Sequence, residues 1–216
     1  MMPLPHRPRT RQPLSAGFTL VELLTVIAII GVLAGLLIPA TSIAFKHVHT
    51  EKTRVQLRNL VQASVQFHEN YKGRWPTMAD SVSVTVDYPL SLKSVAPRWI
   101  NMMSASKDMG IDQKYNPYGI AFYEYKDSDV TQDPSTRTPI DAFGNDDLWL
   151  VFNTDITHKG TIAAEVVNNV KMESTDTGKE VSVDQNSQIP VQGECVGLSP
   201  GDGDEAITTW DVTPPS

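Results

Sequence analysis

One segment, residues 17–40, limits what the whole chain can fold into, because it is long, apolar and interrupted by a single charge. It reads GFTLVELLTVIAIIGVLAGLLIPA, and the charge is Glu22. The 23 residues from Phe18 to Ala40 would form about 34 Å of helix, slightly more than the roughly 30 Å hydrocarbon core of a bilayer. A lone carboxylate in such a helix is costly unless a specific group pairs with it. The segment therefore predicts a membrane-spanning helix whose acid needs a partner.

Cleavage of the chain after Gly17 would create that partner, a new ammonium group on Phe18. Glu22 lies four positions after Phe18, one helical turn away on the same face. A free α-amine is cationic at neutral pH, and N-methylation keeps its charge. The pair could form within one chain or between neighbouring chains. The alternative is a carboxylate that merely extends toward the membrane interface.

The run Gly17-Phe18-Thr19-Leu20-Val21-Glu22 and the apolar residues behind it closely resemble the class III signal of type IV pilins and type II secretion pseudopilins. In that family a membrane-embedded prepilin peptidase cleaves after the glycine and N-methylates the new first residue. The family's glutamate meets the N-terminus of an adjacent subunit and sets its register in the filament. The resemblance covers residues 11–40 and implies these roles for Gly17, Phe18 and Glu22.

The apolar segment is also compatible with two different kinds of N-terminus. An ordinary secretory signal peptide would use Arg7–Arg11 as its basic region and be cut near Ala40–Ala44, but its apolar core is usually only about 7–15 residues long and Glu22 would lie inside it. A plain uncleaved anchor is the second kind. Basic residues flank the segment on both sides, so the positive-inside rule does not orient it. The resemblance implies a cytoplasmic leader and an external body.

Gly31, Gly35 and Pro39 recur every four residues and so share one stripe of the helix. The two glycines form a pair of small residues that permits close helix packing. Pro39 lacks an N–H for the carbonyl of Gly35 and its ring crowds that carbonyl, which predicts a kink or a loosening. The stripe favours a flexible seam between stacked helices, although glycine and proline are also common in membrane helices.

Charge and cysteine content narrow the function classes. The first 17 residues hold three arginines and no acid, so the remainder has 15 basic and 25 acidic residues, a net charge of −10. Such a body is a poor nucleic-acid binder, because neutralising phosphates needs clustered Lys and Arg.

Cys195 is the one cysteine of the chain, which excludes an intramolecular disulfide. Many type IV pilins have a C-terminal disulfide and pseudopilins commonly do not, so this favours a pseudopilin.

The helix should continue to about Lys72, where Gly73 ends it and Pro76 prevents its restart. Leu57, Leu60 and the residues that follow at helical spacing predict a half-buried face. The remainder indicates strands and loops, with candidate strands at 82–86, 120–125, 148–153, 161–167 and 180–184. We therefore predict an α+β fold in which one long helix packs on a small antiparallel sheet.

Four segments follow from these predictions. They are a cleaved cytoplasmic leader (1–17), a transmembrane and filament-core helix (18–42), an amphipathic continuation of that helix (43–72) and a periplasmic β-rich domain (73–216). We expect long loops at 104–118 and 126–140, a variable excursion at 168–190, and a disordered tail at 213–216.

Three short segments resemble pseudopilin motifs and occur in the family's order. Residues 72–77 (KGRWPT) resemble the Gly-x-Tyr-Pro-Thr segment after the long helix, and residues 141–145 (DAFGN) resemble the Asp-Pro-Trp-Gly-Asn turn. Residues 199–203 (SPGDG), with Trp210, resemble the closing Ser-x-Gly-x-Asp-Gly segment. The resemblance implies a calcium site there, for which Asp202, Asp204 and Glu205 could supply oxygen ligands. The usual following Asp-Asp pair is missing, so a plain solvated turn is the alternative.

The residues show no catalytic pattern. His47 and His49 face different sides of a helix, and we expect His68 to be a satisfied residue of the packing face. The Gly201-x-Gly203-x-x-Ala206 match to a dinucleotide fingerprint is surrounded by acids that would repel a pyrophosphate. We therefore expect assembly and not turnover.

The sequence thus predicts a type II secretion pseudopilin, cut by prepilin peptidase and assembled into a periplasmic filament through packing of its N-terminal helices. Its expected partners are other copies or related pilins, an inner-membrane assembly platform and, before assembly, the membrane itself. A surface pilin for adhesion or motility is the rival within the family. A secreted or membrane-tethered binding or enzymatic domain is the rival from another class.

Overall fold

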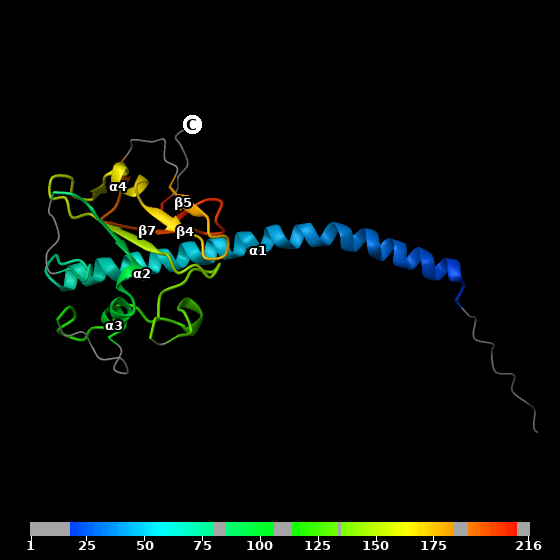
Figure 1. Cartoon of the computed structure of the whole chain (residues 1–216), viewed down its shortest axis with the longest axis horizontal. Helices are drawn as coiled ribbons and strands as arrows, with labels where there is room; N and C mark the ends of the chain where they lie inside the picture. Colours follow the sequence, from blue (N-terminus) through cyan, green and yellow to red (C-terminus); the bar gives the residue numbers. More distant parts are fainter. Residues whose placement is uncertain (1–17, 80–84, 106–113, 134, 184–189, 211–216) are drawn as a thin grey trace, which may run out of the picture. The chain divides into compact units, whose positions relative to one another are not determined.

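The computed structural model describes residues 18–79, 85–105, 114–133, 135–183 and 190–210, and it describes no side chain for residues 38–40. Its elements are, in chain order, α1 (Leu20–Asn70), β1 (Tyr88–Ser91), α2 (Leu92–Val95), α3 (Arg98–Ser104), the 3-10 turn η1 (Asp127–Asp129), β2 (Trp149–Phe152), β3 (Thr161–Ile162), α4 (Ala164–Asn168), β4 (Lys171–Glu173), β5 (Glu180–Ser182), β6 (Val191–Gln192), β7 (Cys195–Ser199) and β8 (Ile207–Thr208). The chain divides into two compact units, Met1–Ala44 and Phe45–Ser216. The predicted α+β architecture, one long helix with a small antiparallel sheet, is confirmed (Figure 1).

Helix α1 has 51 residues and ends two residues before the predicted Lys72. Its last turn closes as a Schellman motif, since the N–H of Gly73 donates to the carbonyl of His68 at 2.9 Å. Lys72 takes the left-handed backbone conformation that this motif requires, with φ of 55°. Gly73 therefore ends the helix as predicted, while the left-handed position itself is a lysine.

The second unit is built around a four-stranded antiparallel sheet of order β1-β2-β7-β8. Its central strands alternate between two cores, because successive side chains of a strand point to opposite faces. Leu150 and Phe152 of β2 and Cys195 of β7 belong to the core shared with α1. Val151 and Val196 face a second core, formed with α4 and the two small two-stranded sheets β3–β6 and β4–β5.

The predicted packing face of α1 is confirmed at Leu57 and Leu60, which are completely buried. Phe67, which the prediction did not include, is completely buried as well. Gly197 lets β7 approach this face, because an added Cβ there would lie 3.3 Å from the side chain of Leu57. His68 corrects our expectation of a satisfied histidine, since its buried Nδ1 has no hydrogen-bond partner among the described residues.

Several strand predictions need correction. Of the strand predicted at 82–86, residues 82–84 lie outside the described residues, and Thr85 and Val86 are not in a strand. The observed strand β1 begins later, at Tyr88. It contains Pro89, which is tolerated because β1 is an edge strand of the sheet. Residues 120–125 are not a strand, because the N–H groups of Phe122 and Tyr123 donate to the Met103 carbonyl at the end of α3. Residues 161–167 divide into β3 and α4.

The other predicted elements agree more closely with the structure. The strands predicted at 148–153 and 180–184 contain β2 and β5. The predicted excursion at 168–190 holds the β4–β5 hairpin. The predicted tail at 213–216 and residues 106–113 of one predicted loop lie outside the described residues.

The two motif segments at 141–145 and 199–203 meet in a buried polar network. The carboxylate of Asp141 accepts hydrogen bonds from the backbone N–H groups of Phe143 and Asn145 and from the Asn145 side chain, at 2.8–2.9 Å. Ser199 Oγ donates to the same carboxylate at 2.5 Å, and Asn145 Nδ2 also donates to the carbonyl of Gly201 at 2.6 Å. Because buried polar groups are costly unless bonded, this network fixes the turn after β7.

Candidate functional site

Helix α1 begins with a capping box formed by Thr19 and Glu22. The backbone N–H and the Oγ1 hydroxyl of Thr19 donate to Glu22 Oε2 at 2.9 and 2.7 Å, and the Glu22 N–H faces Thr19 Oγ1 at 3.3 Å. Such a reciprocal pair satisfies backbone donors that a helix start leaves free. Our sequence reasoning considered Glu22 alone and missed Thr19, although Thr-x-x-Glu before an apolar run is the signature of this box.

The capping box is compatible with the predicted ion pair. Both Thr19 hydrogen bonds end on Oε2, and an ionised carboxylate has about four lone-pair positions. Phe18 lies directly before the cap and is 79% exposed, while Gly17 lies outside the described residues. An ammonium on Phe18 would thus be one residue from the cap, and the pairing stays a prediction because the group exists only after cleavage.

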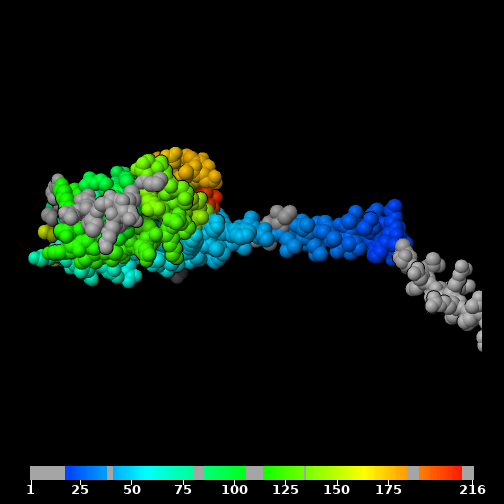
Figure 2. Space-filling view, turned by 90° about the horizontal axis from the view of Figure 1, so that it is seen from below, coloured from blue at the N-terminus to red at the C-terminus, as the bar shows by residue number. Residues whose placement is uncertain are grey.

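The first part of α1 presents an uncovered apolar surface. Its large hydrophobic side chains from Phe18 to Leu37 are 46–79% exposed. Figure 2 draws this part of the helix in blue. An 18-residue window of α1 has a mean hydropathy of 2.7 and no buried share, which makes α1 a candidate membrane span near the N-terminus. Exposure of this much apolar surface to water is unfavourable, so the surface favours a lipid or protein environment.

The small-residue stripe lies on this surface. An added Cβ on Gly31 or Gly35 would meet no heavy atom within 4 Å, so both positions are free for another helix to approach. Pro39 lies within the bounds of α1, but its side chain is outside the described residues. The predicted kink and the predicted packing role of the stripe both stay predictions.

Comparison with known families identifies the N-terminal signal. Residues 13–38 match the prokaryotic N-terminal methylation motif. The chain carries a prepilin-type N-terminus. This motif supports a type IV pilin-like protein that prepilin peptidase processes. No curated protein and no solved structure matches the chain.

The second unit has an acidic turn, residues 199–205, which runs from the last residue of β7 toward β8. Lys46 of α1 forms an ion pair with Asp202 and lies 3.8 Å from Asp204 Oδ2. Lys179, which precedes β5, lies 3.3 Å from Asp204 Oδ1. The hydrogen bond to Asp202 and then the charge of Asp202 raise the pKa of Lys46, and the charges of Asp204 and Glu205 add to this.

The described side chains of the turn do not fit the predicted calcium ion. Calcium takes six to eight oxygen ligands, and no three His, Cys, Asp or Glu side chains among the described residues are grouped closely enough to hold a metal. Lysine ammonium groups contact Asp202 and Asp204, and the carbonyl of Gly201 accepts a hydrogen bond from Asn145. The calcium prediction therefore needs a titration to test it.

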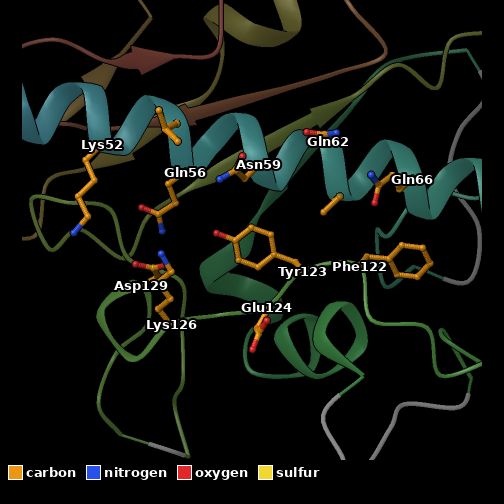
Figure 3. A pocket seen from close by; sticks show the side chains of 12 residues that line it. Lys52, Gln56, Asn59, Gln62, Gln66, Phe122, Tyr123, Glu124, Lys126 and Asp129 are labelled. Carbon is orange, nitrogen blue, oxygen red and sulfur yellow. The ribbon is translucent and has the colours of Figure 1, made fainter.

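A polar groove of about 420 Å³ runs beside the second half of α1 (Figure 3). Amide side chains of α1 line one wall, and Tyr123 and Phe122 line the other. Burial and then the nearby Asp129 raise the pKa of Tyr123 to about 12. The residues that line the groove are Lys52, Val55, Gln56, Asn59, Gln62, Ala63, Gln66, Phe122, Tyr123, Glu124, Lys126 and Asp129.

Proposed function

We propose that this chain is a filament subunit of the type IV pilin-like class, made as a membrane precursor, cut between Gly17 and Phe18, and N-methylated on Phe18. The observation that carries the proposal is the methylation motif at residues 13–38, followed by a helix whose apolar side chains are exposed. Such a surface is suited to lipid before assembly and to neighbouring helices afterwards. The function is assembly and not catalysis.

Glu22 would direct assembly through charge. In a low-dielectric environment an unpaired carboxylate is costly, and the ammonium on Phe18 of a neighbouring subunit would remove much of that cost. Thr19 would hold the carboxylate at the helix start through the capping box and thereby position it for the incoming N-terminus. Gly31 and Gly35 would permit close approach of the stacked helices, and Pro39 would let the helix bend.

Within this class we propose a type II secretion pseudopilin, anchored in the bacterial inner membrane with its second unit in the periplasm. A periplasmic filament of such subunits would push folded proteins through an outer-membrane channel. Support comes from the three pseudopilin-like segments in family order and from Cys195, whose thiol is free and buried. A surface pilus for adhesion or motility is the rival, and imaging of surface fibres would separate the two.

Replacement of Glu22 by alanine tests the assembly mechanism. We expect Glu22→Ala to leave cleavage after Gly17 intact and to reduce filament yield about tenfold or more, since the contact between subunits requires the carboxylate. Cleavage is measured from the mass of the mature chain, and yield from sheared or crosslinked filaments. Thr25→Val, which changes a polar side chain one turn further along α1, is the matched control and should keep the wild-type yield. Wild-type yield from Glu22→Ala would contradict the mechanism.

A further inference from the structure

The acidic turn, residues 199–205, is surrounded by positive charge from two separate elements. Lys46 comes from α1 and Lys179 comes from the segment between β4 and β5. Lys46 Nζ contacts Asp202 and lies 3.8 Å from Asp204, and Lys179 Nζ lies 3.3 Å from the other oxygen of Asp204. Two of the three acids that the sequence suggests for a metal, Asp202 and Asp204, thus already have cationic partners.

The backbone of the turn is held by hydrogen bonds within the turn and by one from Asn145. The N–H of Gly203 donates to the carbonyl of Pro200 at 3.1 Å, and the N–H of Asp204 donates to Asp202 Oδ1 at 3.3 Å. The carbonyl of Gly201, which could otherwise serve as a metal ligand, accepts from Asn145 Nδ2 at 2.6 Å. Calcium loops use such carbonyls together with carboxylates. Here the turn has its shape without a metal ligand set.

We propose that the acidic turn uses protein ammonium groups and not a divalent metal ion as its counter-charge, with Lys46 as the central cation. Lys46 thereby fastens the β7–β8 turn to α1, and Lys179 fastens the same turn to the β4–β5 hairpin. The fold of the second unit is then independent of calcium. It is instead sensitive to ionic strength, because exposed ion pairs weaken as salt screens them.

Charge arrangement explains why the ammonium of Lys46 excludes the metal. A calcium ion at Asp202 would have to displace the Lys46 ammonium, or share the turn with it against the repulsion between two cations. The affinity of surface calcium sites depends on how many carboxylates are available to the ion. Because Lys46 and Lys179 occupy two of the three carboxylates of the turn, too few remain for a tight site.

The first test measures the melting temperature of the full chain in nonionic detergent at fixed ionic strength. We expect the same Tm, within about 1 °C, in EGTA, in 10 mM CaCl2 and in 10 mM MgCl2. If calcium bound with a Kd of about 0.1 mM, the excess of ligand would raise Tm by roughly 5–10 °C. A rise of that size in calcium alone would overturn the proposal.

The second test removes the proposed cation. Lys46→Met should lower Tm in EGTA by about 1–3 °C, the range of an exposed ion pair in a domain of this size. Lys46→Arg should retain the wild-type Tm. Lys52→Met is the matched control on the same helix, because Lys52 forms no ion pair with any residue that the structure describes. Equal Tm values for Lys46→Met, Lys52→Met and wild type would overturn the proposal.

A double-mutant cycle makes the result specific for the pair. Asp202→Asn should lower Tm as Lys46→Met does, and the double variant should lose no more than either single variant, since each removes the same interaction. Fully additive losses would show that the two residues act independently and would contradict a pairing between Lys46 and Asp202.

Discussion

At the scale of single residues, the chain places a few polar groups where their solvation has to be replaced by specific partners. Glu22 obtains two hydrogen bonds from Thr19 at the start of α1, and Asp141 obtains four from the chain around it. His68 differs, because its buried Nδ1 has no hydrogen-bond partner among the described residues. We therefore expect mutation of Asp141 to lower stability, and we expect His68 to make stability depend on pH.

Asp141 should be a strong stability determinant. Asp141→Ala removes the acceptor for two backbone N–H groups, the Asn145 amide and the Ser199 hydroxyl, and all of these but the Phe143 N–H are buried. We expect a loss of about 3 kcal/mol, or roughly 6–12 °C in Tm. Asp127→Ala is the control, because its side chain is 93% exposed, and it should change Tm little. A wild-type melting curve for Asp141→Ala would refute this role.

His68 should make stability depend on pH. Its ring stacks on Trp75 at 3.9 Å between centroids, and burial lowers its pKa despite the opposing charges of Glu194 and Glu69. The unfolded chain, with a histidine pKa near 6.5, therefore takes up the proton at a higher pH than the folded chain does. Stability should be intact above about pH 6.5 and should fall as the pH drops below that value.

Melting curves between pH 7.5 and 5.5 test this. His68→Phe keeps an aromatic ring on Trp75 without the titration, so its Tm should fall less over this range than that of the wild type. Identical pH slopes for the two proteins would show that His68 does not cause the effect.

At the scale of elements, the pattern of apolar residues in each strand decides whether the strand can be predicted from the sequence. β5 alternates exposed and buried residues, and β2 is a continuous apolar run of four residues, so both patterns indicated strands. β7 escaped prediction because its fully buried residues do not alternate and its apolar run is interrupted by Gly197. α2 and α3 are short helices whose residues Leu92, Trp99, Met102 and Met103 join the core shared with α1, so tertiary packing outweighs weak local preference.

Gly203, in the β7–β8 turn, should tolerate an added side chain poorly. Its φ is +87°, and an added Cβ would lie 2.7 Å from Thr177 Oγ1 and 3.1 Å from Ser174 Oγ. Gly178→Ala is the matched control, since its φ is +63° but no atom lies within 4 Å. We expect the control to cost about 1 kcal/mol from backbone strain, and Gly203→Ala to cost a further ~1–3 kcal/mol from crowding. Equal losses of stability, measured by urea denaturation, would show that the space around Gly203 relaxes freely.

At the scale of the whole molecule, the two units of the chain differ in whether their apolar side chains are exposed or buried. The unit Met1–Ala44 exposes apolar side chains along α1, whereas the unit Phe45–Ser216 buries two hydrophobic cores on opposite faces of its sheet. The sequence was sufficient to predict the long helix, because its signal is local and strong. The arrangement of the strands and the contacts of the acidic turn depend on residues distant in the chain, which a single sequence does not bring together.

The most direct test of the proposed assembly mechanism is the identity of the natural N-terminus of the mature protein. Intact-mass and N-terminal peptide analysis of the protein from its native host should give a chain that begins at N-methyl-Phe18, with all 17 leader residues absent. Processing at this bond is what creates the charge that Glu22 is proposed to pair with. A mature chain that begins near Ala40–Ala44, or one that keeps residues 1–17, would contradict the mechanism and favour a secreted or membrane-tethered domain.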